Sequence, residues 1–215
     1  MKQLIRTAVL ATAAAGLLAA PVTAGQATAA PEVPHEGGYV GRVDNPGPIR
    51  AVKQEAVEFF WYDCYHSRQL ELPLERWSAK HASDVTLRRV PAVWAGAPEE
   101  RVQKGHARLY YTLEKLGKVD EFQVAAFKAV NVDEQDVITE DTATAWAGTV
   151  GLDAEKFRAA YRSAEVRDLT EAASGLMAKY KVDELPTVFV NGDRAKPSKN
   201  GGVEGMPAAL DALVD

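Results

Sequence analysis

The sequence predicts an α/β fold that is interrupted by a block of helices. Short apolar and β-branched runs indicate three strands, at residues 57–62, 85–93 and 185–190. Between the second and third of these, residues 99–181 have apolar residues at helical spacing and almost no strand pattern. We therefore expect one α/β domain formed by residues 31–98 and 182–215, with a helical domain inserted at 99–181.

The first strand and the helix after it meet at the only cysteine of the chain. Val57–Tyr62 is short, β-branched and aromatic, which predicts a strand buried on both faces apart from Glu58. Ser67–Lys80 mixes apolar and charged residues as a helix does, with a bend expected near Pro73. Cys64 therefore lies at the start of a helix, where free backbone N–H groups and the helix dipole stabilise an anion such as a thiolate.

The second strand and the inserted helices follow from the same patterns. Val85–Val93 alternates and then becomes apolar, which predicts a central strand ended by Pro91 in a right-handed parallel unit. The first inserted helix is expected to stop at Gly117, and the remaining ones are expected at residues 119–130, 139–150, 153–161 and 166–180.

The C-terminal part predicts a hairpin and a last helix. Leu185–Val190 has a strand pattern and precedes the turn Asn191–Gly192, and the final amphipathic helix begins near Met206. A short edge strand is also expected at Tyr39–Val43.

The N-terminal segment indicates export. Residues 1–30 begin with basic residues, continue with an apolar core at Ala8–Ala20 and end in the small residues Ala27–Ala29, which is the pattern of a cleaved signal peptide. Cleavage after Ala24 is an alternative. The apolar core is too short to span a bilayer. The mature chain is therefore expected to be soluble and periplasmic or extracytoplasmic.

Composition restricts the partners. The chain has 215 residues, 47% of them hydrophobic, which suits one domain with an insertion. Loss of Met1–Ala30, which holds Lys2, Arg6 and no acidic residue, takes the formal charge from −5 to −7. An acidic chain argues against nucleic acid or an anionic membrane as partner. Neither the scattered histidines nor the glycines have a metal-binding or phosphate-binding spacing, so no metal or cofactor is expected, and we expect a monomer.

A single cysteine in an exported chain has three interpretations. It is a buried apolar residue, an intermolecular linker or a reactive thiol, because it has no partner for an internal disulfide. Its place at a strand-to-helix corner, two residues before His66, favours the reactive thiol. Asp63 has the opposite effect, since a carboxylate beside Cys64 disfavours a second negative charge.

The stretch Glu58–Tyr62, followed by Cys64 and His66, resembles the active-site segment of the DsbA family of thiol–disulfide oxidoreductases. The family pattern is a strand, then Cys-Pro-His-Cys, then a helix. Two of the four motif positions differ here, with Tyr65 for the proline and Ser67 for the second cysteine. Residues 88–93 and 106–114 are also similar to stretches of the family, and the resemblance covers most of the mature chain. It implies a thioredoxin-like fold with the DsbA-type helical insertion.

The resemblance implies roles for three catalytic candidates besides Ser67. Cys64 would be the nucleophile, His66 would stabilise its thiolate, and Glu58 would lie buried beneath the site and assist proton transfer. An exposed His66 without a role and an exposed edge Glu58 remain open alternatives. Arg88 or Arg89 is expected to pair with Glu58.

The resemblance also implies a substrate-binding loop. Leu185-Pro186-Thr187 matches the thioredoxin-fold loop in which a cis proline faces the cysteine and the residue before it pairs with the substrate backbone. We therefore predict a cis Leu185–Pro186 bond. Leu185, Pro186 and Thr187, together with Tyr65, are the candidate substrate-binding residues.

Ser67 determines the expected mechanism. A serine cannot close an internal disulfide with Cys64, so the site cannot store two oxidising equivalents. A Cys-x-x-Ser site still forms mixed disulfides and reshuffles wrong ones. The sequence therefore predicts an exported thiol–disulfide interchange protein that acts on cysteines of secreted polypeptides, with a small thiol or a membrane redox protein as a further partner. The alternative is a catalytically inactive peptide-binding or chaperone-like module, and a glutathione-using transferase on the same fold is a weaker one.

Overall fold

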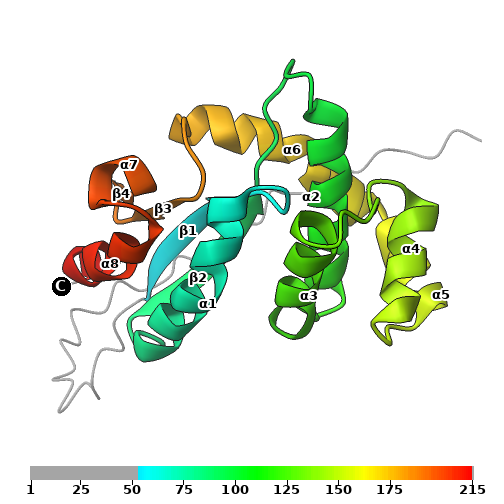
Figure 1. The fold of residues 1–215 in the computed structure, drawn as a ribbon, viewed down its shortest axis with the longest axis horizontal. Coiled ribbons are helices and arrows are strands. Elements are labelled where there is room, and N and C mark those ends of the chain that lie inside the picture. The colour runs from blue at the N-terminus through cyan, green and yellow to red at the C-terminus, as the bar shows by residue number, and fades with distance from the viewer. Residues whose placement is uncertain (1–52, 215) are drawn as a thin grey trace, which may run out of the picture. The chain divides into compact units, whose positions relative to one another are not determined.

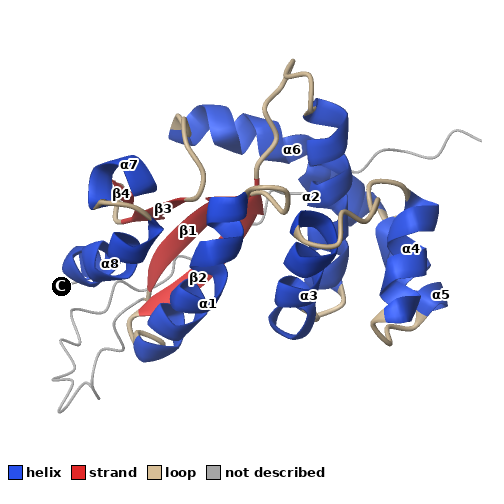
Figure 2. Ribbon diagram, in the orientation of Figure 1, coloured by secondary structure: helices blue, strands red, loops and turns tan. Residues whose placement is uncertain are grey.

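The computed structural model describes residues 53–214 and contains four strands around which the helices are arranged. The expected edge strand at 39–43 and the signal peptide lie outside the described residues. The strands and the helices that flank them are β1 (Gln54–Phe60), α1 (Tyr65–Lys80), β2 (Val85–Pro91), β3 (Thr187–Val190), β4 (Asp193–Ala195), α7 (Pro197–Asn200), a 3-10 turn (Val203–Gly205) and α8 (Met206–Val214). The α/β class with an inserted helical block is confirmed (Figures 1 and 2).

The sheet has the strand order β2-β1-β3-β4, with β1 at its centre. β1 pairs with β2 in parallel and with β3 in antiparallel orientation, and β3 forms a hairpin with β4. The hairpin turn has positive φ at both Asn191 and Gly192, as the Asn-Gly sequence predicts. Strand–helix–strand β1-α1-β2 is the parallel unit that the sequence indicates.

Side chains of β1 contribute to different layers on the two faces of the sheet. Ala56 packs with residues of α1 and α8, among them Leu74 and Leu210, whereas Val57 and Phe59 pack on the other face in a cluster that includes Met177 of α6. All residues of β1 from Ala56 to Phe60 are buried, which confirms the expected burial on both faces. Glu58 is included, so the alternative of an exposed edge residue is wrong.

Five helices occupy the interval between β2 and β3. They are α2 (Glu100–Lys115), α3 (Val119–Asn131), α4 (Glu140–Thr149), α5 (Ala154–Tyr161) and α6 (Ala164–Tyr180). Asp153 caps α5 with a side-chain acceptor, as expected, and Thr139 caps α4 in the same way. Phe60 and Tyr62 of the first α/β segment pack into the core of these helices. The inserted block therefore shares a core with the end of β1.

Several boundaries differ from the expected ones. α1 begins at Tyr65 rather than Ser67, which makes Cys64 the residue that caps the helix. The sequence pattern did not indicate this start because Tyr65 and His66 do not belong to the apolar periodicity. α2 begins at Glu100, seven residues before the apolar repeat that starts at Ala107. The short α7 and the 3-10 turn were not predicted. None of the described helices is long and apolar enough to cross a membrane.

Candidate active site

Cys64 occupies the turn between β1 and α1. Its backbone N–H donates to the carbonyl of Trp61 at 2.9 Å, and its own carbonyl accepts the first helical hydrogen bond, from Arg68 at 3.1 Å. Cys64 has an extended backbone, with φ −92° and ψ 114°, and its side chain makes no capping hydrogen bond. Cys64 thus occupies the N-cap position of α1 with a half-buried side chain. The start of a helix is a position where unpaired N–H groups and the helix dipole favour an anion.

The loop before β3 faces the thiol. The Sγ atom of Cys64 lies 3.9 Å from the carbonyl oxygen of Leu185, although 121 residues separate the two. The Leu185–Pro186 bond is cis, which confirms the prediction. Thr187 is fully buried and its hydroxyl donates to the Glu184 carbonyl at 2.7 Å, which ties the loop to the start of β3. Leu185 of the predicted loop therefore lies near Cys64.

Four large apolar side chains pack against the same core cluster as Cys64. Trp61, Trp94, Leu176 and Tyr180 are partly buried and, with Cys64, pack against the cluster that contains Leu185. Sequence reasoning did not include these four as site residues. Trp61 and Trp94 follow the ends of the neighbouring parallel strands β1 and β2, a position where side chains converge at one sheet edge and which was a usable signal.

Tyr65 and His66 are both exposed in the first turn of α1. The Tyr65 side chain is 54% exposed, its hydroxyl accepts a hydrogen bond from Gln69 at 3.1 Å, and the Arg68 guanidinium lies 5.3 Å from its ring centroid. The His66 ring contacts Tyr65 edge-on, with centroids 5.8 Å apart. Tyr65 is therefore held in place beside the thiol while its ring remains accessible.

Ser67 points into the protein rather than to solvent. It is fully buried, and its Oγ accepts the backbone N–H of Trp61 at 3.3 Å. The hydroxyl therefore links the first turn of α1 to the residue that follows β1.

A buried charge cluster joins β1, β2, α1 and α3. Arg89 places Nε 3.2 Å from Glu58 Oε2 and donates from Nη2 to Glu71 Oε1 at 2.6 Å. The side-chain amide of Gln123 on α3 donates a hydrogen bond to Glu71 Oε2 at 3.4 Å. The oxygen of the same amide accepts a hydrogen bond from the Tyr62 hydroxyl at 2.6 Å. Glu58 and Glu71 are 0% and 2% exposed.

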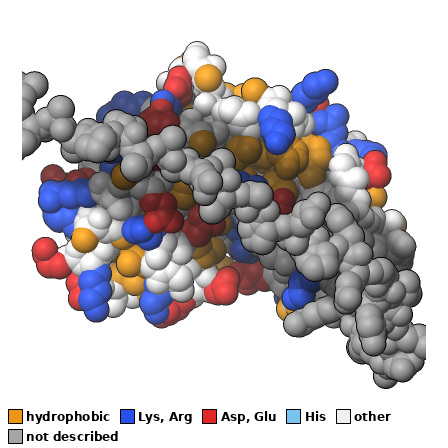
Figure 3. Space-filling model, turned by 180° about the vertical axis from the view of Figure 1, so that it is seen from behind, with side chains coloured by type: hydrophobic (Ala, Val, Ile, Leu, Met, Phe, Trp, Pro, Cys, Tyr) orange, Lys and Arg blue, Asp and Glu red, His pale blue; other side chains and the backbone are white. Residues whose placement is uncertain are grey.

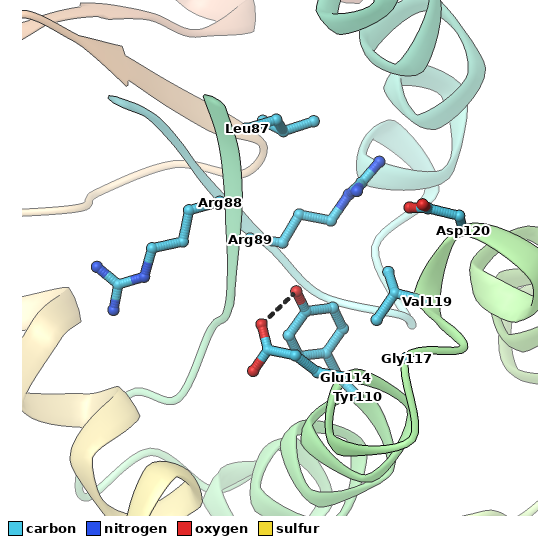
Figure 4. A pocket seen from close by; sticks show the side chains of 8 residues that line it. All are labelled: Leu87, Arg88, Arg89, Tyr110, Glu114, Gly117, Val119 and Asp120. Atoms are coloured by element: carbon cyan, nitrogen blue, oxygen red, sulfur yellow. Dashed lines mark hydrogen bonds between the residues drawn. The ribbon is translucent and has the colours of Figure 1, made fainter. Parts of the chain in front are cut away.

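Burial raises the pKa of both acids in this cluster. It is the largest influence on the pKa of Glu58 and on the pKa of Glu71, and both lie above the ordinary value of 4.5. The nearby Glu58 raises the pKa of Glu71 further. The Arg89 charge opposes both shifts without cancelling them. Figure 4 shows Arg88 and Arg89 leaving β2 in opposite directions. Arg89 is the partner of Glu58, and Arg88 instead lies 3.9 Å from the exposed Glu55.

Asp63, the residue before the cysteine, has a raised pKa. Partial burial and the neighbouring Glu134 raise the pKa of Asp63 above its ordinary value of 3.8. The negative charge that the sequence places next to Cys64 is thereby easier to neutralise.

Residues 57–213 match the DSBA-like thioredoxin domain family. The chain belongs to this family. The thiol:disulfide interchange protein DsbA of Burkholderia cepacia is 30% identical over 201 residues, 92% of each chain, and that of Pseudomonas aeruginosa is 32% identical over 217 residues. The crystal structure of Pseudomonas aeruginosa DsbA superposes with a TM-score of 0.68 at 31% identity, covering 80% of this chain and 85% of that one. The chain is therefore a DsbA-type thioredoxin-fold oxidoreductase, as its resemblance implied.

Two features distinguish this DsbA-type site from the family motif. Tyr65 places an exposed aromatic ring where the motif has proline, and the buried Ser67 stands in the position of the second cysteine. Cys64 is the only cysteine in the sequence, so no other thiol of this chain is able to resolve a disulfide formed on it.

Proposed function

We propose that this protein performs thiol–disulfide interchange through Cys64 alone, by way of mixed disulfides with cysteines of exported polypeptides. Thiol–disulfide exchange is the chemistry of the family. The observation that carries the single-thiol form is the pairing of a half-buried Cys64, at the start of α1, with a buried Ser67.

The reaction has two balanced exchange steps. The Cys64 thiolate attacks one sulfur of a substrate disulfide, forms an S–S bond to it, and the other substrate sulfur leaves as a thiolate. A second thiolate, from the substrate itself or from a small thiol, then attacks the mixed disulfide and returns Cys64 to its thiolate. The first route rearranges disulfides without net oxidation. The second leaves the substrate in a mixed disulfide with the small thiol, and a second molecule of that thiol completes the reduction and leaves as the small disulfide.

The other site residues have supporting roles in this proposal. His66, exposed in the first turn of α1, adds positive charge near the sulfur when protonated, and Glu58 accepts or supplies a proton beneath the site. Leu185 offers its backbone to an extended substrate, with Pro186 and Thr187 fixing the loop. Tyr65 contacts the substrate chain from the opposite side. Ser67 holds the turn without contributing a thiol.

Export is part of the same proposal. The signal-peptide pattern of residues 1–30 would deliver the chain to a periplasmic or extracytoplasmic space, where disulfides persist. Figure 3 shows basic and acidic side chains mixed over the visible face of the described residues, with an apolar patch among them. That face therefore carries no extended basic surface for a nucleic acid.

A second candidate is a peptide-binding module without thiol chemistry. The partly buried aromatic side chains of Trp61, Trp94 and Tyr180, which pack against the cluster that contains Leu185, favour it, because apolar contact with a peptide needs no reaction at Cys64.

One experiment separates the two candidates. The purified mature chain is incubated with glutathione disulfide across a range of pH, and the mixed disulfide is counted by intact mass, with the Cys64→Ala variant as a blank. Rapid formation of one adduct, reversed by reduced glutathione, supports the interchange protein. A thiol that reacts no faster than free cysteine, together with unchanged refolding activity in Cys64→Ala, supports the binding module.

A further inference from the structure

The indole of Trp61 makes a hydrogen bond to the inserted helical block. Its Nε1–H lies 2.9 Å from Nδ1 of His106 on α2, across 45 residues of sequence. His106 is only 3% exposed, and its ring also packs against Trp61 and against Tyr62, each with centroids 6.2 Å apart. This histidine lies outside the set of residues that the proposed exchange reaction uses.

Trp61 links three parts of the active-site turn. Its backbone N–H donates to Ser67 Oγ at 3.3 Å and its carbonyl accepts the N–H of Cys64 at 2.9 Å. Its indole donates to His106, and its side chain packs in the cluster that contains Cys64. The orientation of Trp61 is therefore coupled to the position of the sulfur through one covalent segment and two hydrogen bonds.

The protonation of His106 suits this contact. An indole N–H is only a donor, so Nδ1 of His106 must be the unprotonated acceptor and any ring proton must be on Nε2. Burial lowers the pKa of His106 to about 4, and the nearby Asp136 only partly opposes this. The ring is therefore neutral at physiological pH and keeps its acceptor lone pair.

We propose that His106 is a positioning residue for Cys64: by accepting the indole N–H of Trp61, it fixes the Trp61–Cys64 turn in the geometry that makes the thiol reactive. The proposal rests on the proposed function, because it concerns the same sulfur. It assigns the inserted helical block a part in the chemistry of the α/β domain, through a residue that does not contact the substrate.

The experiment measures the reactivity of Cys64 in single and paired variants. His106→Phe keeps a buried ring and removes the acceptor, His106→Asn restores an acceptor at the place of Nδ1, and Trp61→Phe removes the donor. Thr112→Val is the matched control, since Thr112 is fully buried on the same helix and its hydroxyl bonds only the Arg108 carbonyl at 2.6 Å. The readouts are the second-order rate of Cys64 alkylation by iodoacetamide, the midpoint of thermal unfolding, and the Trp61 indole N–H signal in NMR spectra.

We expect His106→Phe to slow alkylation by about tenfold, the factor that corresponds to one unsatisfied buried donor. His106→Asn should recover most of that rate, and Thr112→Val should lower the unfolding midpoint without changing the rate. Adding His106→Phe to Trp61→Phe should have no further effect, because the contact is already lost. The Trp61 signal should shift in His106→Phe and return toward its original position in His106→Asn.

Two outcomes would overturn the inference: a His106→Phe variant that alkylates at the original rate, or effects of the two substitutions that simply add. If His106→Phe does not fold, Trp61→Phe tests the same contact from the donor side, and an unchanged rate there counts against it. Alkylation needs no disulfide exchange. If the wild-type chain forms no glutathione adducts, the proposed function fails. The alkylation rates of the His106 variants would still test the role of His106.

Discussion

Arg89 donates to Glu71 across 2.6 Å in the interior of the protein, and the same guanidinium lies 3.2 Å from Glu58. One cation thus faces two buried acids. A third acid, the partly exposed Glu75, places Oε1 3.9 Å from Nη2 of Arg89. Isolated charges are costly to bury, and a group removed from such a cluster leaves its partners uncompensated. This cluster joins β1, β2 and α1.

Arg89→Met should strongly destabilise the fold. The substitution leaves Glu58 and Glu71 without their cation, and breaking a buried pair from one side costs about 3–5 kcal/mol. The free energy of unfolding in urea measures this loss. Arg88→Met is the control, because its side chain is 41% exposed and it lies 3.9 Å from an exposed acid, so a change within about 0.5 kcal/mol is expected. Equal losses in the two variants would contradict the inward placement of Arg89.

The same cluster predicts a pH dependence of stability. Because burial raises the pKa of Glu58 and Glu71 above 4.5, the folded chain binds more protons than the unfolded chain between pH 4.5 and neutral pH. Their contribution to stability is therefore present below pH 4.5 and is lost as the pH rises toward neutral. The measurement is the free energy of unfolding of the wild type and of Glu58→Gln from pH 4.5 to 8. We expect this free energy to fall less steeply with pH in the variant. Glu55→Gln, exposed on the same strand, should follow the wild type, and parallel curves for Glu58→Gln would count against the raised pKa.

Ser67→Cys should convert the site to a dithiol. The side chain at 67 is buried and directed to the same turn as Cys64, so a thiol there is expected to form an internal disulfide and to permit net oxidation of a reduced peptide. Thiol counts after incubation with glutathione disulfide, and oxidation of a two-cysteine peptide, test this. Ser67→Ala is the control; it removes the acceptor of the Trp61 N–H, should cost about 1 kcal/mol, and should give no oxidation. A folded Ser67→Cys variant that retains two free thiols would contradict the expectation.

Tyr65→Ala should separate substrate binding from thiol chemistry. The exposed ring of Tyr65, held by Gln69 and Arg68, is placed to contact a polypeptide but is not needed by a small disulfide. Mixed-disulfide formation with an unfolded cysteine peptide should slow roughly fivefold, equivalent to about 1 kcal/mol of lost contact. The rate with glutathione disulfide should change much less. Gln69→Ala, which removes only the hydrogen bond to the ring, should have an intermediate effect, and equal slowing toward both disulfides would exclude a peptide-binding role.

Local patterns were sufficient to predict most elements. The Asp153 cap of α5 and the Asn191–Gly192 turn are specified by neighbouring residues, and both were found where expected. The apolar run of β1 also marked a strand, although the strand spans Gln54–Phe60 rather than 57–62. Helix starts were less accurate. Tyr65 and His66 open α1 with exposed side chains that carry no apolar periodicity, so its start was placed two residues too late.

The sequence by itself determined that one cysteine begins a helix, that a serine replaces its usual partner, and that a proline loop belongs near it. Only the tertiary structure decided that Arg89 rather than Arg88 pairs with Glu58, that Trp94 and Tyr180 pack against the same cluster as Cys64, and that His106 accepts the Trp61 indole N–H. The physical reason is the range of the interactions. Caps, turns and periodicity depend on residues a few positions apart, whereas these contacts join groups separated by tens of residues and depend on how helices and strands pack.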